Sequence, residues 1–361
     1  MKLKKITLIL IAVLAVLTLI AGAVTFTSNN SIIETPKGNA SVVVTGDVMF
    51  ARNMAGVLSL DESPFRHVEN VTGSAVLLLI NFENAATTSG YAVKGDVPLK
   101  CDPSYVPLAK ANNNTVAALA NNHLFDYGTD GMKDTLKSLD DAGITHIGAG
   151  NNESQARQTA SSDINGRNIT IINYMDSNNF KEYSTDVMPQ ANGSDPGYSA
   201  YDSDVAKCQI QDAKANGSDV VIVYFHFGNE YSRSPNPDQE KMAHEVIDYG
   251  ADAVLGSHPH VTQGIEMYKG KPIFYSLGNF IFDMSNSATH IAYIVKMDFV
   301  NDTGECTVYP VIISGYLPYF MGPDEGTSLL NSLSPQCDDL EITPEGTGKL
   351  YFNLTGDTNE S

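Results

Sequence analysis

The sequence predicts an α/β domain, and two observations support this fold class. Short β-branched runs alternate with segments of helical pattern from Ala40 onward. Residues 28–361, which follow an apolar N-terminal stretch, are enough for one large α/β domain or two small ones. The predicted strands lie at residues 41–45, 75–80, 115–120, 169–174, 220–225, 253–256 and 272–275.

Two helices are marked by both their apolar faces and their ends. The first is predicted from apolar residues at helical spacing and a following glycine: Met132, Leu136, Leu139 and Gly143. The second begins at Asn236, with Pro237 at its first helical position and Gln239 as its capping-box partner. Its apolar face and terminal glycine are Met242, Val246, Ile247 and Gly250.

The N-terminus has the pattern of an export signal. Three lysines among the first five residues precede an apolar stretch from Ile6 to Phe26. The stretch is about as long as the ~20 residues that span a bilayer, which slightly favours an uncleaved membrane helix. Ala21-Gly22-Ala23 also resembles a cleavage site, so a signal peptide cleaved near Ala23 stays open. Either way, the positive-inside rule places the rest of the chain outside the cytoplasm.

The same reading divides the chain into four parts. We predict a signal anchor or signal peptide at residues 1–27, a linker at 28–40, the main domain at 41–320 and a C-terminal extension at 321–361. The extension is polar and rich in turns, except for a short apolar run at 350–352 that either packs as a late strand or is loosely held.

The charge and the cysteines limit the partners and the chemistry. A net charge of −20 argues against nucleic acid or an anionic membrane surface as a partner. The four cysteines allow three disulfide pairings outside the cytoplasm and match no zinc-site spacing, so we interpret them as structural: Cys101, Cys208, Cys306 and Cys337. Eleven N-x-[ST] sequons are either glycosylation acceptors or a product of Asn- and Ser-rich composition.

Five predicted strands run into polar residues that a packed core does not need. Each residue alone is also explained by a turn, a cap or a structural hydrogen bond. Because strand carboxyl ends converge at one edge of an open α/β sheet, the set together predicts a site for hard-to-borderline metal ions. Its members are Asp47 and Arg52, Glu83, Asn122 and His123, His226, and His258 and His260.

The order of these motifs resembles the CapA/PgsA family of poly-γ-glutamate capsule-synthesis proteins, relatives of the calcineurin-like metallophosphoesterases. The resemblance runs from about Ser41 to Asp283. It includes GDVMFAR at 46–52, NFE at 81–83, ANNHLFDYGTDG at 120–131, HFGNEY at 226–231, GSHPHVTQGIE at 256–266 and YSLGNFIFD at 275–283. It implies that residues 41–320 form a metallophosphatase-like four-layer sandwich, with two β-sheets flanked by helices.

The resemblance also implies a role for each motif residue. One divalent metal, Mn, Zn or Fe, would be bound by Asp47 and His260, and Glu83 would lie between two metals. The second metal would be held by Asn122, His226 and His258. His123 would face the substrate as a general acid or transition-state donor, and Arg52 would hold an anionic group. The chain departs from the metallophosphoesterase pattern at Met49, where a ligand histidine is expected, so the first metal has one protein ligand fewer.

Several further residues have two interpretations. Asp126 and Glu230 are candidates to orient ligand histidines, and Asp126 is equally well explained as a local cap. Tyr275, Ser276 and Asn279 are predicted to line the cleft, with Tyr275 and Asn279 as substrate-binding residues. Asp283 either binds substrate or ends a turn. The histidines without a motif are read as ordinary residues: His67, His146, His244 and His290.

Three functions follow from these patterns. The first is a surface metal-dependent hydrolase or transferase that acts on an anionic envelope polymer or a phosphoester. The second is a non-catalytic accessory protein of polymer synthesis or export, working within a membrane complex, with its metal structural or absent. The third is a solute-binding module, which the complete set of polar strand-end residues disfavours. Motif residues alone do not separate the first two functions.

Overall fold

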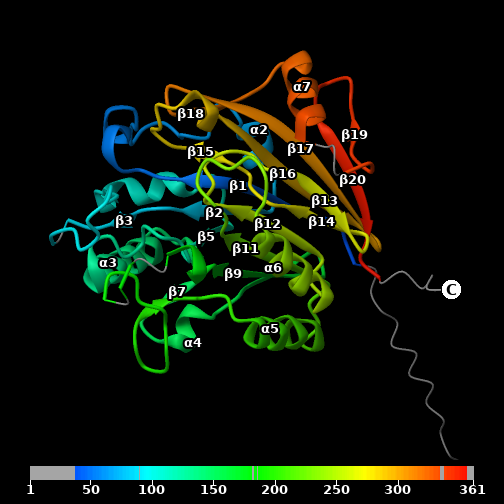
Figure 1. Cartoon of the computed structure of the whole chain (residues 1–361). Coiled ribbons are helices and arrows are strands. Elements are labelled where there is room, and N and C mark those ends of the chain that lie inside the picture. The colour runs from blue at the N-terminus through cyan, green and yellow to red at the C-terminus, as the bar shows by residue number, and fades with distance from the viewer. Residues whose placement is uncertain (1–36, 89, 181–182, 185, 334–336, 356–361) are drawn as a thin grey trace, which may run out of the picture. The chain divides into compact units, whose positions relative to one another are not determined.

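The computed structural model describes residues 37–355, apart from Ser89, residues 181–182, Thr185 and residues 334–336. Within these residues the strands form two large mixed sheets, shown in Figure 1. The larger sheet has ten strands. Eight lie on its main path: β19 (Glu341–Ile342), β20 (Gly348–Asn353), β17 (Thr303–Ser314), β16 (Ile291–Val300), β1 (Ala40–Val48), β2 (Leu77–Phe82), β5 (Thr115–Ala118) and β6 (Thr145–Ile147).

Two further strands complete the ten-stranded sheet, since β15 (Asn279–Ile281) pairs with β1 and β18 (Leu317–Phe320) pairs with β17. The second large sheet has six strands in the order β13 (Ile265–Tyr268), β14 (Lys271–Phe274), β12 (Ala253–Ser257), β11 (Val220–His226), β9 (Arg167–Met175) and β8 (Ala160–Ile164). Two small pairs are β7 (Ala149–Gly150) with β10 (Gly197–Tyr198), and β3 (Ala85–Ala86) with β4 (Lys100–Cys101).

The helices occupy the connections between strands. The α-helices are α2 (Glu69–Thr72), α3 (Gly128–Asp141), α4 (Glu153–Ala156), α5 (Ser203–Ala215), α6 (Pro237–Asp248) and α7 (Pro323–Leu333). The short 3-10 helices are η1 (Arg52–Gly56), η2 (Pro103–Ala109), η3 (Ser177–Phe180) and η4 (Ser287–His290).

Three apolar clusters define the layers. Alternate residues of one strand point to opposite faces of a sheet. Val42 and Val44 of β1 therefore lie in the central cluster with Ile171 of β9 and Ile222 of β11, between the two large sheets. Val43 faces the opposite side, in the cluster that contains the apolar face of α3. A third cluster joins the other face of β9 and β11 to α5 and α6. Two sheets with helices on both outer faces are thus confirmed.

Both predicted helices are present, with the predicted ends. In α3 the side chains of Met132, Leu136 and Leu139 are buried, and Gly143 follows with a φ of +65°. In α6 the Asn236 side chain accepts from the Gln239 backbone N–H while the Gln239 side chain accepts from the Asn236 N–H, which is a complete capping box. All seven predicted strands are also found, within three residues at either end.

The C-terminal residues complete the larger sheet. Strand β20 pairs with β17 in antiparallel register, from Thr303 opposite Asn353 to Val308 opposite Gly348. Leu329, Leu330 and Leu333 of α7 belong to the central cluster. Of the two possibilities for the apolar run at 350–352, the structure therefore shows the late strand.

Two predictions concern export and cysteine chemistry. The predicted signal anchor lies outside the described residues, and within those residues no helix is long and apolar enough to cross a bilayer.

The four cysteines are free thiols, with Cys208 exposed and Cys101, Cys306 and Cys337 buried. Burial raises the pKa of the Cys101 thiol to about 12, as expected for a packed and unreactive side chain.

The backbone around Gly46 leaves no room for a side chain. A β-carbon there would lie 1.8 Å from the carbonyl oxygen of Gly278, which accepts a hydrogen bond from the Asp47 N–H at 3.1 Å. We expect Gly46→Ala to lower the free energy of unfolding by about 2–3 kcal/mol, because β1 and β15 must move apart. Denaturant unfolding followed by circular dichroism measures the loss. Gly322→Ala is the control, since a β-carbon at Gly322 has no neighbour within 4 Å, and an equal effect of both substitutions would contradict the prediction.

Candidate metal centre

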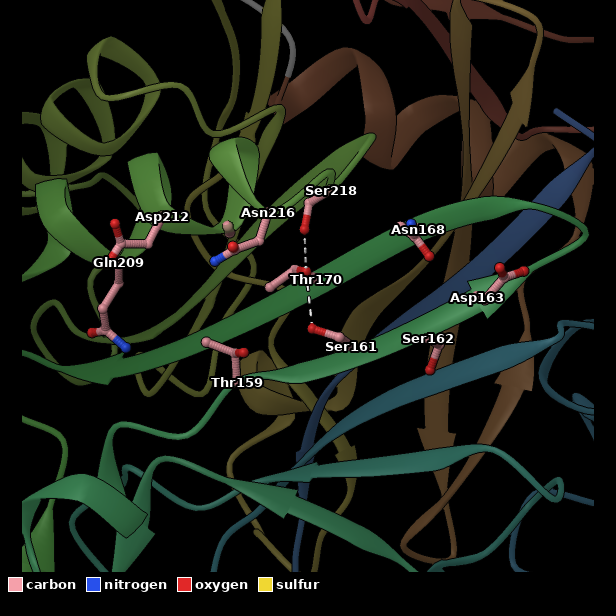
Figure 2. Close-up of a pocket in the computed structure, with 11 residues that line it drawn as sticks. Thr159, Ser161, Ser162, Asp163, Asn168, Thr170, Gln209, Asp212, Asn216 and Ser218 are labelled. Atoms are coloured by element: carbon pink, nitrogen blue, oxygen red, sulfur yellow. Dashed lines mark hydrogen bonds between the residues drawn. The ribbon is translucent and has the colours of Figure 1, made fainter. Parts of the chain in front are cut away.

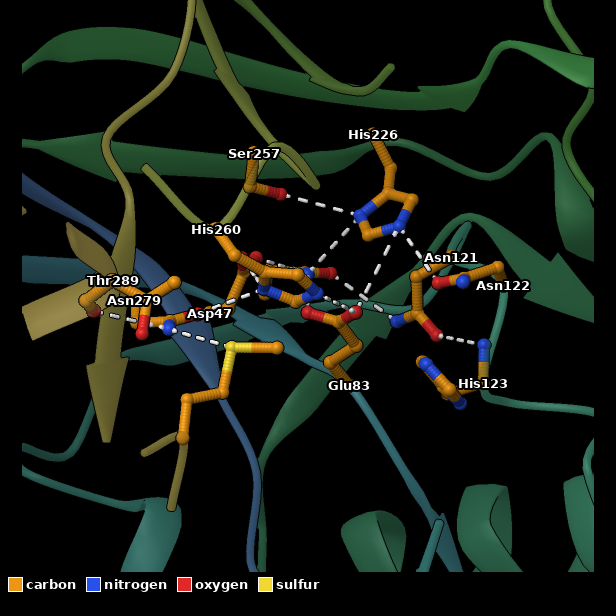
Figure 3. A network of polar contacts seen from close by, with 12 residues as sticks. Asp47, Glu83, Asn121, Asn122, His123, His226, Ser257, His260, Asn279 and Thr289 are labelled. Atoms are coloured by element: carbon orange, nitrogen blue, oxygen red, sulfur yellow. Dashed lines mark hydrogen bonds and ion pairs between the residues drawn. The ribbon is translucent and has the colours of Figure 1, made fainter. Parts of the chain in front are cut away.

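The polar strand-end residues converge where the two large sheets meet. In the larger sheet β1, β2 and β5 are mutually parallel, and in the smaller sheet β9, β11, β12 and β14 are parallel neighbours. Their carboxyl ends deliver three carboxylate and amide residues from one sheet and three histidines from the other. Figure 3 shows these side chains facing one another: Asp47, Glu83, Asn122, His226 and His260, with His123 beside them.

The backbone is strained around this cluster. Five non-glycine residues that line the adjoining cavity have positive φ angles: Arg52 (+53°), Val97 (+43°), Tyr231 (+62°), His258 (+100°) and His260 (+58°). The pairing of β1 with β2 also shifts register between Val44 and Asp47. Such conformations persist where the surrounding structure holds them in place, and they gather at functional sites. Two of these residues, His258 and His260, belong to the groups that could hold a metal ion.

Two buried carboxylates share a single amide donor. The Asn81 side-chain amide donates to Asp47 Oδ1 at 2.8 Å and to Glu83 Oε2 at 3.2 Å. Burial raises the pKa of Glu83 well above its ordinary value, and the nearby negative charge of Asp47 adds to the rise. Burial also acts to raise the pKa of Asp47, but its contacts with His260 and Asn81 outweigh burial and lower it. Two acidic groups with opposed shifts at full burial favour a cation between them.

His226 is the last residue of β11 and is fully buried. Its Nε2 lies 2.9 Å from Asn122 Oδ1. Its Nδ1 lies 3.3 Å from both the Asn81 amide and the Ser257 hydroxyl. Burial and the neighbouring histidines lower the pKa of His226 well below its ordinary value, which keeps the imidazole neutral as a ligand must be.

His258 follows β12 and is also buried, at 3% exposure. Its Nδ1 has no hydrogen-bond partner. Burial lowers the pKa of His258 to about 3. Its ring packs edge-on against Phe180, with 5.0 Å between the ring centroids. A neutral imidazole with a free ring nitrogen is what a metal ion takes from a protein.

His260 is oriented by Asn279. The His260 Nδ1 donates to Asn279 Oδ1 at 2.8 Å and lies 3.3 Å from Asp47 Oδ2. The Asn279 amide is fixed in turn by donating to the Thr289 carbonyl at 3.2 Å. This leaves the His260 Nε2 free on the side of Glu83, whose Oε1 is 4.0 Å away. Asn279, predicted to bind substrate, is placed here as the residue that orients a ligand histidine.

His123 lies next to this group but pairs with a different carboxylate. Its Nδ1 is 2.7 Å from Asp126 Oδ2, which selects the tautomer with Nε2 toward the cavity. Burial lowers the pKa of His123, against the opposing effect of Asp126. Asp126 thus orients a histidine, as one of its two interpretations predicted. Glu230 is exposed at the cavity rim and hydrogen-bonds no histidine among the described residues.

Arg52 reaches the cavity from the start of η1. Its guanidinium forms an ion pair with Asp283 and lies over the Phe282 ring, 5.6 Å from the centroid. The other Asp283 oxygen accepts from the Asn53 N–H at 2.9 Å. Asp283 therefore positions Arg52. This role differs from both sequence interpretations of Asp283, which were substrate binding and the end of a turn.

The structure places Tyr275 away from the cleft, contrary to the sequence prediction. Its ring belongs to the cluster between the six-stranded sheet and α6, and its hydroxyl donates to Glu266 at 2.6 Å. Ser276 is directed away too, since its hydroxyl donates to the Val261 carbonyl at 2.8 Å. The four histidines without a motif contact residues other than the candidate ligands. His67 stacks on the Tyr319 ring, His146 contacts Asp140, His244 contacts Glu266, and His290 contacts the Met284 carbonyl.

The donor set fits divalent metal ions. Asp47 Oδ2, Glu83 Oε1 and His258 Nδ1 are all buried without a hydrogen-bond partner in the described residues. Leaving three such atoms unpaired is costly unless a cation satisfies them. The group of Glu83, His226 and His258 and the group of Asp47, Glu83 and His260 each bring their ligand atoms within 4.8 Å of one another. Oxygen and imidazole donors suit Mn, Zn or Fe, and Glu83 belongs to both groups.

A cavity of about 430 Å³ opens onto this cluster and is lined by Asn122, His123, His258, His260 and Arg52. Two polar residues of the site, Lys94 in the cavity lining and Asn81 beside the carboxylates, were not predicted as functional. Lys94, on the connection between β3 and β4, carries no sequence motif that would reveal it. Asn81, behind the ligands, stands within the NFE motif and could have been found from its place two residues before Glu83.

A second groove, of about 460 Å³, lies over β8, β9 and α5 (Figure 2). Its floor carries a row of hydroxyls, with Thr170 Oγ1 at 3.0 Å from Ser161 Oγ and 2.6 Å from Ser218 Oγ. Its described lining contains no histidine, lysine or arginine. The two cavities are similar in size, so size does not identify the functional site. The chemistry of their linings does, and we assign the functional site to the first cavity.

Comparison with known proteins relates this chain to proteins of capsule and polymer synthesis. Residues 41–284 match the family described as bacterial capsule synthesis protein PGA_cap. The PGA biosynthesis protein CapA of Bacillus subtilis is 34% identical over 340 residues, covering 89% of this chain and 86% of that protein. The capsule biosynthesis protein CapA of Bacillus anthracis is 31% identical over 265 residues, covering 71% and 63%. A probable polyglutamine synthesis accessory protein of Mycobacterium tuberculosis is 32% identical over 222 residues, covering 60% and 58%.

Among solved structures, a calcineurin-like phosphoesterase of Bacillus subtilis has a TM-score of 0.42 at 14% identity, covering 89% of this chain and 92% of that one. The NAD nucleotidase of Haemophilus influenzae has a TM-score of 0.45 at 14% identity, covering 83% and 56%. The family match spans the strands that carry all the candidate ligands, from Asp47 to His260. The chain therefore belongs to the bacterial capsule synthesis protein family PGA_cap.

Proposed function

We propose that this protein is an extracytoplasmic metal-dependent hydrolase of capsule or poly-γ-glutamate synthesis, acting on an anionic envelope polymer or a phosphoester. One or two divalent metal ions would be held by Asp47, Glu83, Asn122, His226, His258 and His260. The observation that carries the proposal is that three buried ligand atoms, on Asp47, Glu83 and His258, have no hydrogen-bond partner among the described residues. A purely structural cluster has no reason to leave them unpaired.

The chain's own residues supply the rest of the reaction. When bound, the metal would lower the pKa of a coordinated water towards ~7 and polarise the substrate oxygen. In its imidazolium form, with the Nδ1 proton held by Asp126, His123 would donate the Nε2 proton to the leaving group. Arg52, fixed by Asp283, is placed to hold an anionic group of the substrate. The cavity walls of Phe180 and Phe282 would limit the access of bulk water.

The setting follows from the family and from the N-terminal sequence. Two relatives are named for PGA or capsule biosynthesis. We propose that residues 1–27 anchor this protein in the membrane, with the described domain outside the cytoplasm and in reach of a polymer synthesis or export complex. An anionic polymer is compatible with the acidic surface, because charges beyond ~8 Å are screened at physiological salt.

A second candidate is an accessory protein without turnover. Met49 stands where a further ligand is expected, and its buried thioether instead accepts from the Ala51 N–H at 2.9 Å. The Mycobacterium relative is also named as an accessory protein. In this alternative the metal is structural or absent.

Metal content separates the proposal from a metal-free scaffold. We expect the purified protein, reconstituted with Mn, Zn or Fe, to hold one or two metal ions per chain by mass spectrometry. His258→Ala should reduce affinity at least tenfold, because it removes a ligand of the group formed with Glu83 and His226. The control is His244→Ala, since His244 lies outside both groups and pairs with Glu266.

Turnover then distinguishes the two candidates. The loaded protein would be screened with phosphoester and γ-glutamyl substrates. Hydrolysis that His258→Ala abolishes supports the hydrolase. Bound metal without turnover would support the accessory protein. The absence of metal after reconstitution would refute the proposed metal-dependent hydrolase.

A further inference from the structure

We propose that Lys94 is an anion-binding residue of the cavity, and that it recognises an acidic oxygen group, phosphate or carboxylate, on the ligand. The inference deepens the proposed function, on which it rests, by naming the chemistry of the group that enters the cavity beside His123. Neither a sequence motif nor the metal-ligand pattern includes Lys94, which lies in the connection between β3 and β4.

The first argument is that the Lys94 ammonium is buried with donors to spare. Lys94 is only 4% exposed, although it lines the cavity. Its Nζ makes a hydrogen bond to the Asn122 carbonyl at 3.1 Å. An ammonium has three N–H donors, and a buried charge is costly unless its donors are used. The position therefore suits an acceptor that arrives with the ligand.

The second argument is that Lys94 forms a buried ion pair, but no hydrogen bond, with the nearest carboxylate. Asp126 Oδ2 accepts from the Leu99 N–H at 2.6 Å and lies 2.7 Å from His123 Nδ1. The Lys94 Nζ is 3.7 Å from Asp126 Oδ1, which is close enough for attraction but too far for a hydrogen bond. Arg52 differs, because Asp283 pairs with it directly.

The third argument is that Lys94 is held in place from both sides. The Val93 N–H donates to the Asp126 carbonyl at 2.8 Å, and the Leu99 N–H donates to the Asp126 side chain. The Tyr183 ring lies 5.2 Å from the Nζ. One residue, Asp126, thus fixes both His123 and the backbone on either side of Lys94. A cation and a proton donor held by the same carboxylate are preorganised for one bound oxyanion.

The cavity is lined by residues of both charges. Asp96 and Glu230 would repel an acidic group, whereas Lys94 and Arg52 would attract one. We expect the acidic group of the ligand between Lys94 and His123, and Arg52, which is paired with Asp283, is the second cation of the cavity. A polymer with regularly spaced acids, or a phosphodiester, would satisfy both cations.

The test is equilibrium binding of two probes, inorganic phosphate and glutarate, to the metal-free and the metal-loaded protein by calorimetry. We expect Lys94→Met to raise Kd at least tenfold for one or both probes, with unchanged metal content, and Lys94→Arg to stay within about threefold of the wild type. Lys133→Met, on the exposed face of α3, is the matched control. A response to phosphate alone indicates a phosphoester ligand, and a response to glutarate alone indicates a carboxylate ligand.

Several outcomes overturn the proposal. Unchanged Kd values in Lys94→Met would do so, as would the failure of both probes to bind the wild type. Parallel loss of metal and probe would show that Lys94 acts only by positioning Asn122. If Lys94→Met does not fold, Lys94→Gln compared with Lys94→Arg gives the same contrast. Wild-type protein that binds no metal refutes the proposed function, while the metal-free arm still tests Lys94.

Discussion

Glu83→Gln is expected to remove metal binding and, at the same time, to make the metal-free protein more stable. Glu83 is fully buried beside Asp47, and both burial and that neighbouring charge raise its pKa. A neutral amide keeps the hydrogen bond from Asn81 without the buried charge. We expect the free energy of unfolding of the metal-free protein to rise by about 1–3 kcal/mol, measured by denaturant titration with a chelator present.

The raised pKa of Glu83 also predicts how the stability of the metal-free protein changes with pH. Because the pKa of Glu83 is raised on folding, the folded state binds more protons than the unfolded state at pH values above the ordinary value of 4.5. The metal-free wild type should therefore lose stability as pH rises through the interval between 4.5 and the raised pKa. Glu83→Gln should flatten this slope, because it removes the titrating group.

The control for this experiment is Glu240→Gln, an exposed position on α6. It should change neither metal content nor the pH slope. If Glu83→Gln were as destabilising as the loss of an ordinary buried contact, the carboxylate would be serving the fold and not a cation. That result would count against the metal centre.

His123→Gln is expected to have the largest effect on turnover. His123 belongs to neither group of metal-ligand candidates, and its ring is oriented by Asp126 toward the cavity. A general acid typically contributes about 10²–10⁴-fold to the rate. We therefore expect kcat on a phosphoester or γ-glutamyl substrate to fall at least about 100-fold, while metal content by mass spectrometry stays at the wild-type level.

His67→Gln provides the comparison, because His67 is exposed and stacks on Tyr319 away from the cavity. An equal fall in both variants would point to a general loss of folded protein. Loss of metal in His123→Gln would instead place His123 among the ligands. Turnover that survives the substitution would remove the proton-donor role and leave Lys94 and Arg52 as the remaining polar contacts of the substrate.

The sequence could predict the ligands because the parallel strands place their ends together. An apolar run followed closely by Asp47, Glu83 or His226 specifies both the strand and the sheet edge where the side chain appears. That local rule needs no knowledge of which strands are neighbours. The helices α3 and α6 could be predicted for a similar reason, because their capping residues and apolar spacing are also local features of the sequence.

Residues whose role depends on distant packing could not be predicted. Lys94 functions through its distance from Asn122 and Asp126, which lie 28 and 32 positions later in the chain. Tyr275 ends a predicted strand, yet its side chain faces α6, because alternation along the strand sends it to the outer face of the sheet. Asn279 is assigned to His260 only by their hydrogen bond. Each of these depends on tertiary contacts that periodicity does not contain.

The pairing of β1 with β16 also bears on how the chain acquires its structure. One edge of β1 pairs with the nearby β2. On its other edge Ala40 is opposite Phe299 of β16, about 260 residues later, and β20 joins the sheet later still. Contacts this distant in sequence slow folding, since a long loop must close before the pairing stabilises anything. The larger sheet is therefore complete only once nearly the whole of the described domain has been synthesised.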